Sequence, residues 1–182
     1  LILRAGWRTL FDVERPGVLA FRVVLTTLEV ASFYYAVKFM QLADAITFWM
    51  ASPIYVAALS PLLLGEHVGW RRWTAIAIGF VGVLIALRPS AETLTPPALI
   101  AIFGSLCFGL MMITGRAVRR SADLALVFWP TVGAGLFGLA LSLVAWAPPT
   151  GFDFALLALL GVIALAAHFF TNRSLQLADA AT

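Results

Sequence analysis

Charged residues and cysteine are both scarce in this chain, and each scarcity excludes a class of protein. Only 12% of the 182 residues are charged, whereas soluble globular domains carry about 25%. The one cysteine, Cys107, lies inside an apolar run, so it provides neither a disulfide framework nor a metal cluster. No glycine-rich phosphate-binding loop is present, and we expect no cofactor, no metal and no ATP-driven step.

Apolar residues dominate instead, and they form long uninterrupted runs. Hydrophobic residues make up 62% of the chain, against roughly 45 to 50% in soluble domains. The stretch Ala45 to Leu64 contains no charge, and about 20 such residues span a bilayer. Unbroken runs of this kind favour helices over barrel strands. The sequence therefore predicts an all-α integral membrane protein.

Turn and cap residues divide the chain into six expected membrane spans. Thr95, Ser121 and Asp153 stand where N-terminal helix caps belong, and Gly65 stands where a C-terminal cap belongs. Four tryptophans near span ends fit interfacial aromatic belts, namely Trp70, Trp73, Trp129 and Trp146. The six expected spans are Gly17 to Val37, Ala45 to Leu64, Trp73 to Leu87, Pro97 to Thr114, Leu124 to Trp146 and Phe154 to Asn172.

One heptapeptide occurs twice in the chain. QLADAIT, beginning at Gln41, returns as QLADAAT, beginning at Gln176, 135 positions later and with six of seven residues identical. The upstream positions Tyr34, Tyr35 and Lys38 are matched in kind by Phe169, Phe170 and Arg173. A period this long exceeds that of solenoid repeats and indicates that half a domain is duplicated.

Arginine and lysine are distributed unevenly among the connections between these spans. Residues 1–16, 65–72, 116–123 and 173 onward hold nine arginines, whereas the other connections hold only Lys38 and Arg88. The positive-inside rule places the nine arginines in the cytoplasm. Five crossings separate the two heptapeptides, so we expect them on opposite sides of the membrane. The repeat is therefore predicted to be inverted, as is typical of secondary transporters.

When the sequence is aligned with itself at an offset of 135 residues, some expected spans have no counterpart within the chain. The repeat therefore predicts further spans before the first residue and after the last. The intact protein is then a ten-helix inverted repeat of five plus five, and this chain carries six of its spans. Residues 1–88 are expected to form the C-terminal part of the first repeat, from the end of span two through span five. Residues 97–182 are expected to form the N-terminal part of the second, from span six to the start of span nine. The lack of an initiator methionine and of a signal peptide fits an internal fragment.

One long stretch resembles a known family. FYYAVKFMQLADA, then Ser52 and Pro53, then LLLGEHVGWRRWTAIAIGFVGVLIALRP is similar to the EamA-type families of the drug/metabolite transporter superfamily. Arg22 and Glu66 stand where members of these families often place an arginine and an acid. The resemblance covers nearly the whole chain and implies ten helices in two halves, with both termini cytoplasmic. Because members move amino acids, vitamins, nucleotide-like metabolites and drugs in either direction, substrate and direction stay open.

Glu29 is the first candidate for a functional residue. It lies about 12 residues into the first span, roughly 18 Å from the cytoplasmic edge and close to mid-membrane. A carboxylate at that depth marks a substrate or proton pathway, with structural pairing as the alternative. Arg22 lies about 10 Å away along the helix axis. It is expected to snorkel to the cytoplasmic interface, with a place in the pathway as the alternative.

Two polar residues of the last span are further pathway candidates. His168 lies one turn beyond Ala164, the repeat counterpart of Glu29, so we expect both helices to present a polar residue to the cavity between the halves. The alternative is a neutral histidine that is satisfied by a backbone carbonyl. Asn172 is either a donor in the cavity or a polar helix end.

Pro53 is expected to kink the second span, because proline removes a backbone donor and frees a carbonyl. The kink is a candidate gate. Around it, Trp49, Ser52 and Tyr55 provide aromatic and hydroxyl groups suited to a planar or amphipathic organic substrate, with ordinary helix packing as the alternative. The glycines of the third and fifth spans are expected to serve close packing, namely Gly79, Gly82, Gly133, Gly135 and Gly138.

The leading hypothesis is a secondary transporter that exports or takes up small amino-acid, vitamin or drug-like compounds by alternating access. The alternatives are an integral membrane enzyme, which would need clustered catalytic groups at one depth, and a non-transporting membrane scaffold. We expect a multi-pass protein of the bacterial inner membrane with its arginine-rich loops in the cytoplasm. Expected partners are the substrate, the lipid bilayer and protons as a candidate coupling ion, not nucleic acid. Monomer and homodimer stay open.

Overall fold

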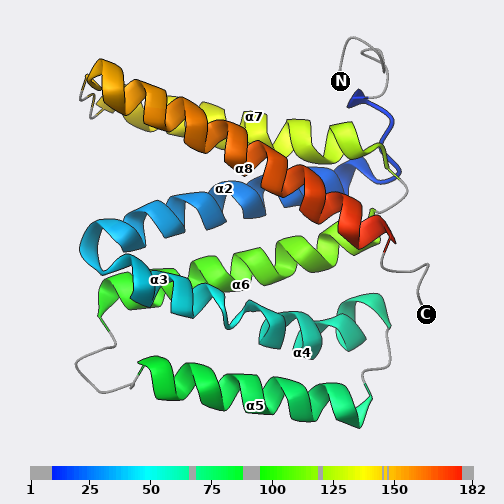
Figure 1. The fold of residues 1–182 in the computed structure, drawn as a ribbon. Coiled ribbons are helices and arrows are strands. Elements are labelled where there is room, and N and C mark those ends of the chain that lie inside the picture. Colours follow the sequence, from blue (N-terminus) through cyan, green and yellow to red (C-terminus); the bar gives the residue numbers. More distant parts are fainter. Residues whose placement is uncertain are drawn as a thin grey trace. The chain divides into compact units, whose positions relative to one another are not determined.

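Seven α-helices occur in the part of the chain that the structure describes. A computed structural model describes residues 10–65, 69–87, 95–118, 121–144, 146 and 148–177, and these residues include no β-strand. The helices in chain order are α2 (Pro16–Phe39), α3 (Leu42–Trp49), α4 (Ser52–Leu64), α5 (Trp70–Leu87), α6 (Pro96–Ala117), α7 (Asp123–Val144) and α8 (Gly151–Leu177) (Figure 1). The expected all-α class is confirmed.

Five helical stretches among the described residues are long and apolar enough to cross a membrane. They are Pro16–Phe39, Leu42–Leu63, Pro96–Ala117, Leu124–Val144 and Gly151–Thr171. The apolar part of α5, Trp73–Ile85, is shorter than the others. Trp70, Trp73 and Trp146 are exposed, as residues of an interfacial aromatic belt would be. The chain is therefore a multi-pass helical membrane protein.

The second expected span is two helices instead of one kinked helix. Helix α3 ends at Trp49, and α4 begins at Ser52, with Met50 and Ala51 between them. Pro53 lies in the first turn of α4, where the missing N–H of proline costs no intrahelical hydrogen bond. The second span is therefore interrupted next to Pro53, as expected, and the interruption lies just before the proline. The chain breaks before the proline, and the proline starts the next helix.

The caps of two helices follow the sequence signals. Gly65 ends α4 with φ 67° and ψ 18°, a left-handed conformation that glycine adopts without steric cost. Thr95 caps α6, because its Oγ1 accepts a hydrogen bond from the backbone N–H of Ala98 at 3.4 Å. Ser121 instead accepts a hydrogen bond at 3.0 Å from the N–H of Glu14, far away in sequence.

The start of α8 differs from the expectation that Asp153 is its N-cap. The helix begins at Gly151, and Thr150 and Asp153 form a reciprocal capping box around this start. The N–H of Asp153 donates to Thr150 Oγ1 at 3.2 Å, and the N–H of Thr150 donates to Asp153 Oδ2 at 3.1 Å. Asp153 is therefore the third helical residue, and the threonine before the glycine is the cap.

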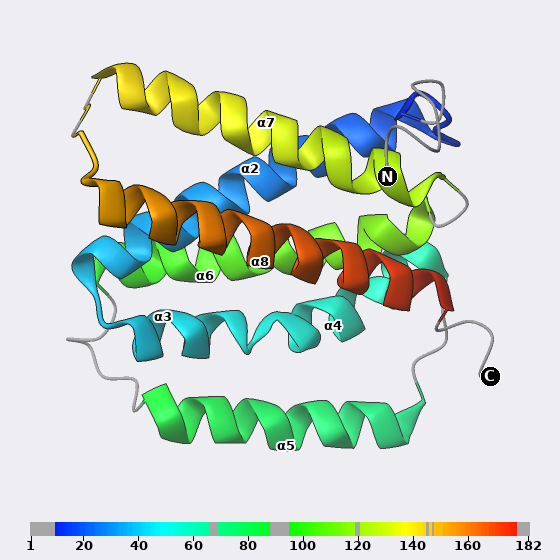
Figure 2. The ribbon, with the colours of Figure 1, turned by 45° about the horizontal axis from the view of Figure 1, so that its top comes forward.

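The described helices fall into two compact units. The first comprises residues 1–24 and 118–182, and the second comprises residues 25–117. In the second unit, α3 and α4 follow one another along α6, and they lie between α6 and α5 (Figures 1 and 2). Small side chains allow this packing, since Ala36 of α2, Ala45 of α3 and Ala101 of α6 form one buried cluster.

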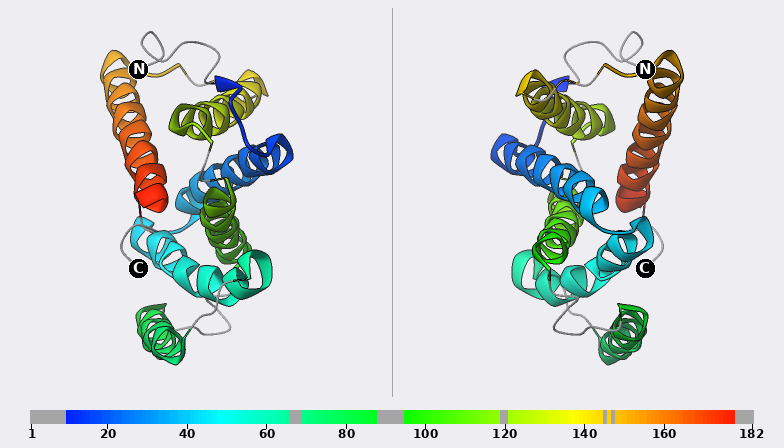
Figure 3. Two further views of the ribbon diagram at one scale, coloured as in Figure 1. Left: turned by 90° about the vertical axis from the view of Figure 1, so that its right-hand side faces the viewer. Right: turned by 90° about the vertical axis from the view of Figure 1, so that its left-hand side faces the viewer.

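In the first unit, α7 and α8 are antiparallel neighbours joined by a short connection (Figure 3). Leu19, Val118 and Leu126 form its buried cluster, against which Trp129 packs. The indole Nε1 of Trp129 donates a hydrogen bond to the carbonyl of Leu10 at 2.9 Å. Trp129 therefore packs against protein, which corrects its expected place in an exposed aromatic belt.

Helices α2 and α8 begin in the same register of the repeat. Their first residues are Pro16 and Gly151, which are 135 positions apart, like the two heptapeptides. The backbone hydrogen bonds that close their first turns run from Leu19 to Arg15 and from Phe154 to Thr150, again with this offset. The second heptapeptide itself falls almost entirely outside the described residues.

Candidate functional site

Glu29 forms a hydrogen bond with the last residue of α3. The indole Nε1 of Trp49 donates to Glu29 Oε1 at 2.9 Å, and the pair is partly buried. Glu29 lies in the middle of α2, and Trp49 is at the break between α3 and α4. A buried carboxylate needs a donor, and the indole supplies one. The structure therefore brings together two residues that the sequence analysis proposed separately.

The ring of Trp49 packs between α2 and α6. It makes an edge-to-face contact with Phe33, with ring centroids 5.1 Å apart and planes at 86°. On the other side it touches Gly104 of α6. A Cβ placed on Gly104 would lie 2.8 Å from two atoms of the Trp49 ring and 2.7 Å from the Cβ of Ser32. Only glycine leaves room for the indole and for Ser32 at this position.

Ser52 and Tyr55, at the start of α4, meet a second glycine of α6. A Cβ placed on Gly109 would lie 3.1 Å from the Cβ of Tyr55 and 3.5 Å from the carbonyl oxygen of Ser52. Ser52 is buried, and Tyr55 is half-buried. The two sides of the helix break thus each contact α6 at a glycine. The residues Glu29, Phe33, Trp49, Ser52 and Tyr55, with the two glycines, form what we call the break site.

Two hydroxyl groups of the same unit are buried near apolar neighbours. Thr26 Oγ1 donates to the sulfur of Met111 at 3.2 Å, which links α2 to α6. Ser60 of α4 is 2% exposed, and its Oγ has no hydrogen-bond partner among the residues that the structure describes. A buried hydroxyl without a partner is costly, so Ser60 is a second polar position on α4 that could accept a ligand or a water.

Arg22 is buried, which corrects the expectation that it snorkels to the interface. Only 2% of the residue is exposed, so its guanidinium is enclosed by protein. His168 lies on α8 and is half-buried. Arg22 and His168 belong to the first unit, and the break site belongs to the second. The side chain of Asn172 and the whole of Glu66 lie outside the described part of the chain.

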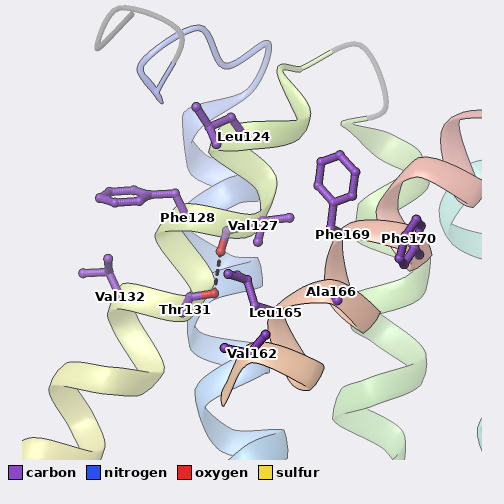
Figure 4. A pocket seen from close by; sticks show the side chains of 10 residues that line it. All are labelled: Leu124, Val127, Phe128, Thr131, Val132, Val162, Leu165, Ala166, Phe169 and Phe170. Atoms are coloured by element: carbon purple, nitrogen blue, oxygen red, sulfur yellow. Dashed lines mark hydrogen bonds between the residues drawn. The ribbon is translucent and has the colours of Figure 1, made fainter. Parts of the chain in front are cut away.

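A separate cavity of about 820 Å³ lies between α7 and α8 (Figure 4). Thr131 is its one polar lining residue, and its Oγ1 donates to the carbonyl of Val127 at 2.7 Å. Leu165 and Phe169 of α8 line it from the other side. Because its walls are apolar, this cavity suits hydrocarbon or an apolar helix face better than a polar metabolite. The break site carries the polar chemistry.

Sequence reasoning missed Phe33, Gly104 and Gly109 as members of the site. Gly104 and Gly109 lie in the span that is half buried inside the protein, the largest share among the five. Small residues in an apolar span are a signal of close helix contacts, and this signal was available in the sequence. The contact with Phe33 depends on how α3 folds back on α2, which no local pattern reveals.

These features define a class: a multi-pass α-helical membrane protein with a half-buried carboxylate and tryptophan and a buried serine hydroxyl beside a broken span. Residues 2–88 match the EamA-like transporter family. This part of the chain is similar to that family, in agreement with the resemblance noted in the sequence.

Curated relatives with transporter names match most of the chain. The S-adenosylmethionine uptake transporter of Rickettsia prowazekii (strain Madrid E) is 25% identical over 168 residues, which are 92% of this chain and 57% of the relative. The riboflavin transporter of Rhizobium johnstonii is 32% identical over 162 residues, which are 88% of this chain and 54% of the relative. An uncharacterized transporter of Helicobacter pylori (strain 26695) is 36% identical over 123 residues, covering 66% and 41%.

The chain spans between half and three-fifths of the length of the first two of these relatives, at 57% and 54%. No solved structure matches it.

Proposed function

We propose that this chain is part of a secondary transporter that carries small organic metabolites by alternating access. The observation that carries the proposal is the hydrogen bond between Glu29 and Trp49 at the break of an apolar span. Transporters place polar recognition groups at discontinuous helices inside the membrane, and a lone buried carboxylate there is too costly to be incidental. A scaffold needs no such group, and an enzyme would need several reactive groups around it.

The substrate class follows from the chemistry of the break site and from the relatives. Riboflavin and S-adenosylmethionine, after which the relatives are named, both contain a planar nitrogen heteroaromatic ring that bears a hydroxylated sugar or sugar-alcohol group. Phe33, Trp49 and Tyr55 provide aromatic surfaces for such a ring. Glu29 provides an acceptor for ring N–H groups, and Ser52 adds a hydroxyl. Metabolites of this shape are the substrates we propose.

The proposed architecture is ten helices in two inverted halves, with residues 1–88 and 97–182 as parts of the two repeats. The common offset of the heptapeptides and of the starts of α2 and α8 supports this arrangement. We place the protein in the bacterial inner membrane with its arginine-rich loops in the cytoplasm. In this arrangement α5 also crosses the membrane, which brings the spans of this chain to six.

Protons are the coupling ion that we propose, with Glu29 as the group that binds and releases them. The other titratable side chains on the described parts of α3, α4 and α6 are Asp44, Tyr55, Cys107 and Arg116. Asp44, the other carboxylate, is exposed, whereas Glu29 is half-buried at the break, so Glu29 is the group suited to exchange a proton with water during a cycle.

Uptake by the full-length protein in proteoliposomes tests the proposal. Riboflavin and S-adenosylmethionine serve as the first probes, each with and without an inward proton gradient. We expect accumulation or exchange of a heteroaromatic probe, and a decrease of roughly 10-fold or more in the Trp49→Ala variant, since aromatic contacts in binding sites typically carry this much energy. Trp70→Ala, which changes an exposed tryptophan of α5, is the matched control. The absence of uptake, exchange and binding for heteroaromatic metabolites in general would reject this function.

A further inference from the structure

Trp49 contacts two other helices, α2 and α6, at the same time. It is the last residue of α3. Its Nε1 donates to Glu29 of α2 at 2.9 Å, its ring packs edge-to-face on Phe33 of α2, and its far edge occupies the space above Gly104 of α6. One side chain at the helix break is thus fixed by a polar contact, an aromatic contact and a close backbone contact.

The contact at Gly104 is so close that any side chain there would have to displace Trp49 or Ser32. A Cβ there would come within 2.8 Å of the indole, a separation that real side chains do not tolerate. Glycine is also unfavourable in the interior of a helix, relative to alanine. The close contact with Trp49 and Ser32 gives a physical reason for glycine at this point of α6.

The backbone alone does not hold the angle between α3 and α4 at the break. Between α3 and α4, the backbone hydrogen bonds are those of Met50 to Ile46, Ala51 to Phe48 and Ile54 to Ala51, all local. None of them sets the direction of α4 relative to α3 in the way that a continuous helical ladder would. Contacts of side chains with neighbouring helices must therefore fix this angle.

We propose that Trp49 is a positioning residue that fixes the angle between α3 and α4 at the break in the second span. Its hydrogen bond to Glu29 and its contact with Gly104 hold the end of α3 against α2 and α6. The two half-helices change their angle only when the indole leaves this position. The role in the transport cycle rests on the proposed function, whereas the holding contact is a property of the protein without substrate.

A cysteine at the break reports whether the contact is formed. Ala51→Cys is introduced into the full-length protein with Cys107→Ser and any other cysteine replaced, and the rate of maleimide labelling is measured in detergent without substrate. Glu29→Leu and Trp49→Phe should each raise the labelling rate severalfold, because each removes the hydrogen bond between the indole and the carboxyl group. The double variant should label no faster than either single variant, since both changes remove the same bond. Glu29→Gln keeps an acceptor oxygen and should stay within about threefold of the unsubstituted protein.

Gly104→Ala tests the same contact from the side of α6. The added methyl group must displace Trp49 or Ser32, so labelling at residue 51 should rise severalfold. Gly79→Ala in α5 and Gly138→Ala in α7 are matched controls, because a Cβ at either position meets nothing within 4 Å. Both controls should label at the rate of the unsubstituted protein.

Unchanged labelling in Glu29→Leu and in Trp49→Phe would overturn the inference, and so would additive effects in the double variant. If Gly104→Ala does not accumulate in the membrane, the first pair of variants still decides, because neither adds volume to the core. The assay needs no substrate, so a protein that transports nothing would reject the proposed function and leave this result untouched.

Discussion

Helices α2 and α8 start at positions related by the offset of the two heptapeptides, yet their surroundings differ. They begin 135 positions apart, at Pro16 and Gly151. Helix α2 buries a stripe of side chains at helical spacing, namely Leu19, Arg22, Leu25, Thr26, Ser32 and Ala36. In α8, no residue of Gly151–Thr171 is buried. The counterparts of the stripe are Phe154, Leu157, Leu160, Gly161, Ala167 and Thr171.

The two stripes also differ in chemistry. Three members of the α2 stripe are polar, and Glu29 lies beside them, whereas the α8 stripe is apolar except for Thr171. Glu29 and Arg22 have Ala164 and Leu157 as counterparts. The copies thus share a helix and a register but not a polar site. The sequence repeat predicts the helix and its start, and the positions where the two copies differ include the polar residues of the candidate site.

The prediction with the largest expected effect concerns the side of the membrane on which each of the two heptapeptides lies. A cysteine at Gln41 should be labelled from outside intact cells by a membrane-impermeant reagent, and one at Gln176 only after permeabilisation. The five expected crossings between them and the uneven distribution of arginine require opposite sides. Labelling of both positions from the same side would show that the copies are parallel, and the comparison of α2 with α8 would then need a different symmetry.

The next prediction concerns Glu29, whose counterpart at the 135-residue offset is the uncharged Ala164. Glu29→Gln should abolish accumulation driven by a proton gradient while leaving substrate exchange, since the amide keeps the size and cannot exchange a proton. The dependence of uptake on external pH should flatten in this variant. Asp44→Asn, which changes an exposed acid in the first turn of α3, is the matched control. Equal accumulation by the Gln variant and the unsubstituted protein would make Glu29 a structural residue.

A smaller effect should show whether the α8 stripe is buried in the full-length protein. Ala167 is the counterpart of the buried Ser32, and Ala155 is the counterpart of the exposed Ala20. Ala167→Leu should destabilise the protein by about 1 to 3 kcal/mol through overpacking, and Ala155→Leu should be nearly neutral. Thermal unfolding in detergent measures the difference. Identical melting of the two variants would mean that α8 faces lipid where α2 faces protein.

The smallest effect comes from the different starts of the two helices. Helix α2 begins with a proline at its first position, whereas α8 begins with the capping box of Thr150 and Asp153. Thr150→Ala should cost about 1 kcal/mol of stability and loosen the first turn of α8 alone, as measured by hydrogen exchange of the N–H of Asp153. Thr74→Ala, which removes a hydroxyl bonded within α5, should leave that exchange unchanged.

The helices were largely predictable because length and hydrophobicity decide where a membrane helix forms. The expected Gly17 to Val37 became Pro16–Phe39, and the expected Pro97 to Thr114 became Pro96–Ala117. The start of α8 was placed three residues too late, because Asp153 was read as a cap when it is the partner of one. Such local errors arise where two residues could each fill the same role.

The site was only partly predictable, because its geometry depends on contacts between helices. Glu29 and Trp49 were each proposed from depth and residue type, but their hydrogen bond requires α3 to fold back along α2 after Met40 and Gln41. The burial of Arg22 likewise depends on neighbouring helices, which no pattern within α2 specifies. The sequence pattern identified these residues, but their contact partners depend on the packing of the helices.

Pro53 gives the second span a permanent joint. Since proline has no N–H, the hydrogen bond that would join residue 53 to Trp49 in a continuous helix can never form. The gap in the backbone hydrogen-bond ladder at residue 53 is therefore permanent, and α4 starts beside it. Bending of the span at this point has one backbone hydrogen bond fewer to rupture than bending of a continuous helix would have.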